Sequence, residues 1–286
     1  MTRSPDVFYT FSMPELPEVE TIARGLDKRV RGDVIDSVWL GKHPEPLKSS
    51  AQEIASALAA TRIAQVRRVG KHIVFDLEAK SSRNGNISRQ WIVHLGMTGR
   101  MLVCAPEQEV PKHTHAIATL SSGRELRFVD PRRFGRLSVV SAQEFAGPGT
   151  EPLTVSAADF AKLFHGRKTP IKAALLNQTL LHGVGNIYAD ESLFRAGISP
   201  RRQAGRLTRP ELDRLHAAVK EVLKQAIKMG GSSVSDYVDA EGREGFFQLR
   251  HKVYMRTGEP CLACRTLIKR TVLGGRGTHY CPRCQR

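Results

Sequence analysis

The chain has 286 residues, enough for two or three domains with separate cores. It carries 44 lysines and arginines against 28 acidic residues, a net charge of +16, which is typical of proteins that bind a polyanion such as nucleic acid. No apolar run approaches the about 18 residues of a membrane span, and residues 1–12 lack the apolar core of a secretory signal. We therefore expect a cytoplasmic protein that binds nucleic acid and no membrane. A basic surface that is merely solvated is the alternative.

The first region, residues 13–145, is rich in strands. One helix opens it, because Pro17 suits a first helical turn and an apolar stripe at four-residue spacing begins at Ile22. A second helix is expected over 51–60. The strand segments are rich in Val and Ile and lie near 34–41, 62–78, 90–104, 115–129 and 134–141.

The second region, residues 150–231, is predicted to be helical and to follow a Gly-Pro-Gly linker at 147–149. Thr208 and Glu211 form a capping box that opens a helix with one apolar face. The Gly-Gly pair that closes the region is expected to end this helix.

The C-terminal region, residues 232–286, begins with a loop and ends in a finger of about residues 250–286. Two Cys-x-x-Cys pairs stand sixteen residues apart in it, with Cys261, Cys264, Cys281 and Cys284 as their members. This spacing is typical of a zinc ribbon, in which four thiolates hold one Zn²⁺ and the residues between them form a hairpin, here turning at 274–277. Two disulfides are the alternative, which a cytoplasmic setting disfavours. Because four sulfur ligands leave no open position, we expect a structural metal.

Six short motifs are too specific to serve packing alone. They are Met13-Pro-Glu-Leu-Pro-Glu-Val-Glu20, Gly70-Lys71, His94-Leu-Gly-Met-Thr-Gly99, Asp130-Pro-Arg-Arg-Phe-Gly135, Gly183-Val-Gly-Asn-Ile-Tyr-Ala-Asp190 and Gly275-Arg-Gly-Thr-His-Tyr280. In this order, and followed by the four cysteines, they resemble the formamidopyrimidine-DNA glycosylase family from Met13 to the last residue. The resemblance implies an α+β multidomain fold: an N-terminal two-layer β-sandwich with flanking helices, a helix–two-turn–helix domain and a C-terminal four-cysteine zinc finger. These parts match the three regions above.

The resemblance implies a base-excision repair enzyme that removes 8-oxoguanine and formamidopyrimidines from duplex DNA and cleaves the strand by β,δ-elimination. By resemblance Pro14 attacks the sugar C1′, and Glu15 transfers protons during sugar opening. Lys71 and Arg276 match the positions that serve the elimination steps. An N-terminal amine has a pKa near about 8, against about 10.4 for lysine, so more of it is neutral and nucleophilic. Without the motif, Lys71 would be taken for a surface lysine. For Glu15 and Glu18 the alternative is the favourable placement of acids near a helix N-terminus.

Such an enzyme must extrude the damaged nucleotide, and side chains must fill the gap that it leaves. By resemblance Met97, Arg132 and Phe134 enter the base stack, and Arg132 reads the orphaned cytosine. A lone Met or Phe is more often part of a core. Further DNA contacts are implied for His113, Arg132, Arg167, Asn186 and, near the damaged base, Lys172. The segment 235–247 resembles a loop that closes over the base, and the expected partner is double-stranded DNA with oxidised bases or abasic sites, bound by a monomer.

The sequence departs from the family at its nucleophile, because twelve residues precede Met13. The nitrogen of a proline inside a chain belongs to a tertiary amide, which is neither basic nor nucleophilic. A translation start at Met13 with removal of that methionine, cleavage of the extension, or loss of the lyase chemistry would each account for this. We favour the first, because the motif begins directly at a methionine. Two other functions stay open: a non-catalytic protein that binds damaged DNA, and an endonuclease VIII-like enzyme for oxidised pyrimidines.

Overall fold

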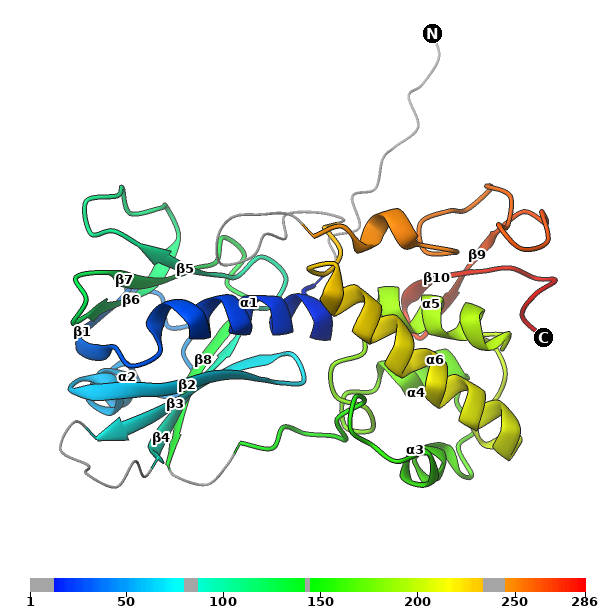
Figure 1. Cartoon of the computed structure of the whole chain (residues 1–286), viewed down its shortest axis with the longest axis horizontal. Helices are drawn as coiled ribbons and strands as arrows, with labels where there is room; N and C mark the ends of the chain where they lie inside the picture. Colours follow the sequence, from blue (N-terminus) through cyan, green and yellow to red (C-terminus); the bar gives the residue numbers. More distant parts are fainter. Residues whose placement is uncertain (1–12, 80–86, 142–144, 234–244) are drawn as a thin grey trace, which may run out of the picture.

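Figure 1 shows a molecule of two lobes that lie side by side. It is a computed structural model that describes residues 13–79, 87–141, 145–233 and 245–286. Strands dominate the lobe built from the first half of the chain, and helices dominate the other, which also carries the C-terminal hairpin. None of the described helices is long and apolar enough to cross a membrane. A loop was expected over 235–247, and its residues 235–244 lie outside the described residues.

The strand-rich lobe contains helices α1 (Leu16–Val30) and α2 (Ala51–Leu58) and one antiparallel sheet. Its strands are β1 (Val34–Leu40), β2 (Thr61–Val69), β3 (His72–Ala79), β4 (Ile87–His94), β5 (Arg100–Cys104), β6 (Thr114–Leu120), β7 (Glu125–Val129) and β8 (Arg136–Ser141). They pair in the order β5-β7-β6-β1-β2-β3-β4-β8. β1 pairs with β2 through Val34 and Ile35 and then leaves it to pair with β6. The expected two-layer sandwich is thus present, and both of its layers belong to one sheet that folds over at this corner (Figure 1).

Both layers and both helices bury their apolar side chains in one core. Helix α1 begins with Pro17 in its first turn, as expected, and its predicted stripe from Ile22 is buried. The segments expected near 62–78 and 90–104 are each divided into two strands. The divisions fall at Gly70 and Gly96, whose positive φ angles of 57° and 64° turn the chain. Two of the six motifs therefore occupy the turns at one end of the sheet.

The helical lobe is built from α3 (Ala157–Phe164), α4 (Ile171–Leu176), α5 (Asn186–Ala196) and α6 (Arg209–Lys228), with the short 3₁₀ helices η1 (Ala204–Arg206) and η2 (Phe247–Arg250). The predicted capping box is confirmed: the Glu211 carboxylate accepts a hydrogen bond of 2.8 Å from the N–H of Thr208. Helix α6 then buries one face against α3 and α5 and also contacts α1. This contact joins the two lobes.

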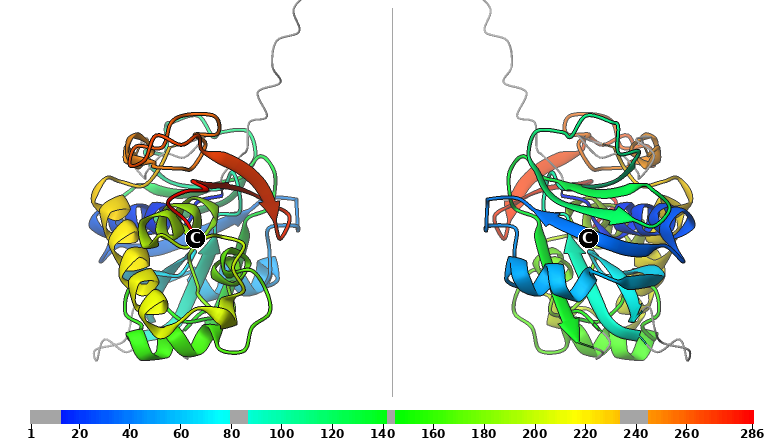
Figure 2. Two further views of the ribbon diagram at one scale, coloured as in Figure 1. Left: turned by 90° about the vertical axis from the view of Figure 1, so that its right-hand side faces the viewer. Right: turned by 90° about the vertical axis from the view of Figure 1, so that its left-hand side faces the viewer.

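The C-terminal hairpin consists of β9 (Lys269–Leu273) and β10 (Arg276–Tyr280), and it packs against α5 (Figure 2). Its turn is shorter than the expected 274–277. Gly274 and Gly275 alone make it, with φ angles of 55° and 72°, because a two-residue hairpin turn of this kind needs positive φ at both positions. Arg276 is consequently the first residue of the return strand and not a turn residue.

Candidate active site and zinc centre

A cavity of about 570 Å³ opens between the start of α1, the α4–α5 segment and the C-terminal hairpin. Residues from both lobes and from the hairpin meet in it, although they lie far apart in the sequence. Its lining includes Met13, Glu15, Lys71, Asn186, Tyr254 and Arg276. Three of the four predicted catalytic side chains therefore share one cavity, and the fourth, Pro14, lies between two residues that line it.

Glu15 lies at the point where two helices begin. It caps α1, and its carboxylate also accepts hydrogen bonds from the N–H groups of Ile187 (3.0 Å) and Tyr188 (3.4 Å) in the first turn of α5. A Cβ atom at Gly185 would stand 2.2 Å from the Glu15 carboxyl carbon, so the Gly-Val-Gly-Asn motif needs glycine there. Burial raises the pKa of Glu15, against the opposing effects of the Lys71 charge and of these N–H groups. The carboxyl group is thus fixed in place and better able to hold a proton.

Lys71 follows Gly70 in the turn between β2 and β3 and is buried. Its side chain lines the cavity, which excludes the interpretation as an ordinary surface lysine. Burial lowers the pKa of Lys71, and the nearby charge of Arg276 lowers it further, whereas Glu15 raises it. A lowered pKa increases the fraction of neutral amine, which can accept a proton from a substrate.

Glu18 was not among the predicted site residues, yet it contacts Glu15 directly behind the cavity. Its buried carboxylate accepts hydrogen bonds from the N–H groups of Glu15 (2.9 Å) and Ser232 (2.7 Å) and from the hydroxyl of Tyr188. Burial and the neighbouring Glu15 charge raise the pKa of Glu18 to about 7. The capping-box position hid this role, because an acid at the third helical residue is common for local reasons.

The three predicted wedge residues lie on two adjacent loops at one end of the sheet. Phe134 is 47% exposed, the exposed Arg132 guanidinium lies 4.9 Å from its ring centre, and Met97 is half-buried. Asp130 ties the loops together, because it accepts hydrogen bonds from the Thr98 hydroxyl (2.6 Å) and from a backbone N–H of the second loop (2.7 Å). Exposure of this kind is unusual for core residues, and it makes Arg132 and Phe134 accessible to a ligand.

The predicted phosphate-binding residues are not gathered at one point. His113 and Arg167 are exposed, the first just before β6 and the second after α3. Asn186 is the first residue of α5 and lines the cavity, and its buried Oδ1 atom has no hydrogen-bond partner among the described atoms. The unpartnered amide oxygen can accept a hydrogen bond from a ligand in the cavity.

Lys172, which was predicted to lie near the damaged base, is not among the residues that line the cavity. Its side chain is fully buried, and its Nζ atom lies 2.7 Å from Asp190 Oδ1 and donates to the carbonyl of Gly277 at 2.9 Å. The lysine therefore lies behind the cavity wall and contacts the hairpin. The motif spacing could not reveal this, because the direction of the side chain depends on how the hairpin packs on α4 and α5.

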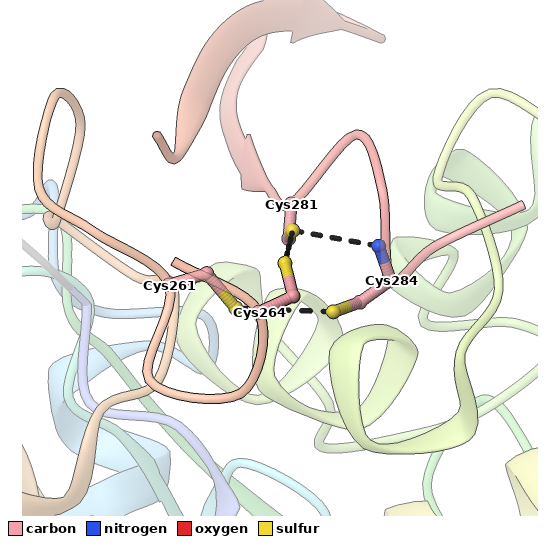
Figure 3. Close-up of side chains that lie close together, drawn as sticks. All are labelled: Cys261, Cys264, Cys281 and Cys284. Carbon is pink, nitrogen blue, oxygen red and sulfur yellow. Dashed lines mark hydrogen bonds between the residues drawn. The ribbon is translucent and has the colours of Figure 1, made fainter. Parts of the chain in front are cut away.

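The four cysteines of the finger form one cluster, and Figure 3 shows their side chains pointing toward one another. Their sulfur atoms all lie within 4.8 Å of one another, with 3.9 Å from Cys261 to Cys284 and 3.4 Å from Cys264 to Cys281. A disulfide needs about 2.05 Å, whereas four thiolates at about 2.3 Å from one zinc ion lie several ångströms apart. The cluster thus fits a tetrahedral Zn²⁺, and no disulfide joins these cysteines.

Comparison with known proteins agrees with this geometry over almost the whole chain. Residues 13–137 match the formamidopyrimidine-DNA glycosylase N-terminal domain, and 147–238 match the H2TH domain of the same enzymes. Residues 258–286 match the zinc finger found in FPG and IleRS. The chain belongs to the formamidopyrimidine-DNA glycosylase family. The predicted family, fold and single structural zinc are confirmed, and the glycosylase is an enzyme of base-excision DNA repair with abasic-site lyase activity.

Full-length relatives support the assignment. The formamidopyrimidine-DNA glycosylase of Solibacter usitatus is 46% identical over 279 residues, and that of Desulfitobacterium hafniense is 44% identical over 282. Each match covers 96% of this chain and 100% of the relative. The structure of the Thermus thermophilus MutM (FPG) protein has a TM-score of 0.83 at 41% identity and covers 95% of this chain and 98% of that one. A Lactococcus lactis FPG mutant bound to DNA with Fapy-dG has a TM-score of 0.86 at 32% identity, and covers 96% of this chain and 100% of that one.

The start of the match bears on Pro14, the predicted nucleophile. The N-terminal domain match begins at residue 13, one position before Pro14. Pro14 is buried, whereas Met13 lines the cavity. Without Met13 the nitrogen of Pro14 would become an amine beside the cavity and next to Glu15.

Proposed function

We propose that this glycosylase removes oxidised purines, 8-oxoguanine and formamidopyrimidines, from duplex DNA and cleaves the strand through a Schiff base on Pro14. The observation that carries the proposal is the cavity in which Glu15, Lys71 and Arg276 meet beside Met13 and Pro14. Related structures support the substrate class, because they hold DNA with Fapy-dG, with an abasic site, or with carbocyclic 8-oxo-G.

The first step needs the chain to begin at Pro14. Its secondary amine then attacks C1′, a bond forms between nitrogen and carbon, and the glycosidic bond breaks with its electron pair leaving on the base. The proton that the amine nitrogen loses neutralises the departing base. Glu15 donates a proton to the sugar ring oxygen as the ring opens, which gives an iminium ion. The raised pKa of Glu15 supports this role, because a carboxyl group must be protonated to act as an acid.

The later steps cut the strand. The iminium ion acidifies C2′–H, a base removes that proton, and the 3′ phosphate leaves in β-elimination. Removal of the C4′ proton then expels the 5′ phosphate in δ-elimination. We assign Lys71 to proton transfer, because burial and the charge of Arg276 lower its pKa. We assign Arg276 to the leaving phosphate, because its guanidinium is always charged and binds phosphate through two parallel hydrogen bonds.

Further DNA contacts, most of them outside the cavity, hold the duplex. We propose that Met97, Arg132 and Phe134 fill the gap left by the extruded nucleotide, with Arg132 on the orphaned cytosine, because these side chains are exposed or half-buried on adjacent loops. His113, Arg167 and Asn186 bind phosphates, and Lys172 acts through the hairpin that it contacts. One chain supplies all these groups, which supports a monomer. We propose that it acts on cytoplasmic DNA.

Borohydride trapping on a duplex with 8-oxoguanine opposite cytosine tests the proposal. Protein that begins at Pro14 should give a covalent adduct with the DNA, and protein that retains residues 1–12 should give none. Pro14→Gly should reduce trapping, since it removes the secondary amine. Strand cleavage by protein shown by mass spectrometry to retain residues 1–12 would contradict the role of Pro14.

A second measurement separates substrate classes. Excision of 8-oxoguanine opposite cytosine is compared with excision of thymine glycol, an oxidised pyrimidine, under the same conditions. Faster excision of 8-oxoguanine is expected, and faster excision of thymine glycol would favour an endonuclease VIII-like specificity.

A further inference from the structure

We propose that Asp190 is a positioning residue, which holds Arg276 at the cavity by fixing the return strand of the zinc hairpin. The inference rests on the role that the proposed function gives to Arg276. It predicts that δ-elimination depends on a carboxylate that itself touches no DNA.

The contacts run from α5 to the hairpin. Asp190 is buried in α5, and its Oδ2 atom accepts a hydrogen bond of 2.8 Å from the N–H of His279 and lies 3.2 Å from the Nδ1 atom of that residue. Its Oδ1 atom lies 2.7 Å from the ammonium of Lys172, which in turn donates to the carbonyl of Gly277 at 2.9 Å. Strand β10 is therefore held at two alternate residues, and Arg276 directly precedes the first of them.

The hairpin needs such attachment to fix an exposed arginine. A two-stranded ribbon is marginally stable by itself. The zinc cluster fixes one end of β10, because Cys281 directly follows its last residue, whereas Arg276 lies at the other end beside the turn. Lys172 and Asp190 fix the middle of the strand and so limit how far Arg276 can move.

Charge balance supports a role in positioning. An unpaired Asp190 carboxylate would put a buried negative charge beneath the site proposed for a phosphate, and Lys172 neutralises it. Burial lowers the pKa of Lys172, and the Asp190 charge raises it. Arg276 lies close enough to lower this pKa further. A buried ion pair contributes little to stability relative to apolar residues of the same volume. Orientation of the strand therefore accounts for the pair better than stability does.

The test measures two steps separately in protein that begins at Pro14. In Asp190→Asn, borohydride trapping should proceed as in the wild type, whereas the ratio of δ- to β-elimination products on an abasic duplex should fall about tenfold, because misplaced groups lose rate steeply. Asp213→Asn is the matched control, since that exposed aspartate pairs with Arg209 at 2.9 Å on α6. It should leave the product ratio unchanged.

Arg276→Gln separates the role proposed for Arg276 from the positioning role proposed for Asp190. If this variant keeps the wild-type product ratio, the role assigned to Arg276 fails. If it lowers the ratio and Asp190→Asn does not, only the positioning inference fails. The combined variant should be no worse than Arg276→Gln alone, and a further fall would show that Asp190 acts by another route.

A folding defect is distinguished by a second variant and by the metal content. Lys172→Met combined with Asp190→Leu replaces the pair by apolar side chains and should keep the fold, bind one zinc and show the same lowered product ratio. If both variants lose zinc and also show the lowered product ratio, Asp190 maintains the finger as a whole, which would overturn the inference. A wild-type ratio in this double variant would also overturn it.

Discussion

The Glu15 carboxylate accepts a hydrogen bond from the backbone N–H of Ile187, across the boundary between the two lobes. Glu15 is the N-cap residue of α1, and its carboxylate binds the first turn of α5, so this one residue joins the starts of two helices. The start of α1, which carries Pro14, cannot shift relative to the Gly-rich segment before α5 without breaking this contact. The proposed nucleophile, proton donor and phosphate-binding residue Asn186 are consequently held in one frame.

Gly185→Ala should damage the active site. The added Cβ atom would stand 2.2 Å from the Glu15 carboxyl carbon, so the carboxylate must move, at an expected cost of about 1–3 kcal/mol in the free energy of unfolding. Excision of 8-oxoguanine should fall more than this loss of stability explains. Gly41→Ala is the control, because its Cβ atom would lie 3.3 Å or more from every neighbour. Urea unfolding and excision kinetics measure both effects, and normal excision by Gly185→Ala would contradict the geometry.

Glu18 should make stability fall as the pH rises. Its pKa is raised in the folded state from 4.5 to about 7, so folding favours the protonated form. The stabilising contribution is fully present below about pH 4.5 and is lost as the pH rises through about 7, with a total of about 3 kcal/mol. Glu18→Gln cannot titrate. The wild type should therefore lose more unfolding free energy than this variant between pH 5 and pH 8. Equal losses would refute the raised pKa of Glu18.

A cluster of histidines at the junction of the lobes should make the protein sensitive to acid. The His72 ring lies 4.9 Å from that of His94 and 5.3 Å from that of His182, measured between ring centres. Burial is the main cause that lowers the pKa from 6.5 to about 4 in His72, about 3 in His94 and about 4 in His182. Neighbouring charges such as Lys71 lower these values further. The neutral rings stabilise the fold above pH 6.5, and this contribution is lost as the pH falls toward 4.

His72→Phe tests this cluster, because phenylalanine keeps an aromatic ring and cannot gain a proton. For a shift from 6.5 to about 4, the contribution of His72 should fall by about 2 kcal/mol between pH 7 and pH 5. The wild type should lose that much more unfolding free energy over this interval than the variant. Equal losses would show that His72 stays uncharged or is already exposed to solvent.

Cys281→Ser should disrupt the finger while the strand-rich lobe stays folded. Three remaining thiolates bind zinc more weakly, and a finger this small depends on the metal for its folding energy. DNA cleavage should be abolished, because Arg276 would no longer be held at the cavity. Cys104→Ser, outside the cluster, should keep zinc and activity. Metal analysis, hydrogen exchange of β1 to β8 and cleavage assays test this, and full cleavage after confirmed loss of zinc would contradict it.

Local signals allowed much of the fold to be predicted. The capping box of Thr208 and Glu211, the proline at the start of α1 and the cysteine spacing each involve residues a few positions apart or joined by one hairpin. The long strand segments were less well predicted. Their interruptions at Gly70 and Gly96 follow from backbone conformation, and Val- and Ile-rich patterns do not report it.

The sequence by itself determined the family, the zinc ligands and the identity of the candidate catalytic residues, because ordered motifs and short spacings are properties of the chain alone. Only the tertiary structure decided that Glu18 shares its carboxylate with Tyr188 and Ser232, and that Lys172 turns toward Asp190 and the hairpin. Such contacts join segments that are remote in sequence, and the packing of the lobes and the hairpin sets their geometry. A residue pattern reports the periodicity of its own element, so it cannot show which distant group a buried charge will meet.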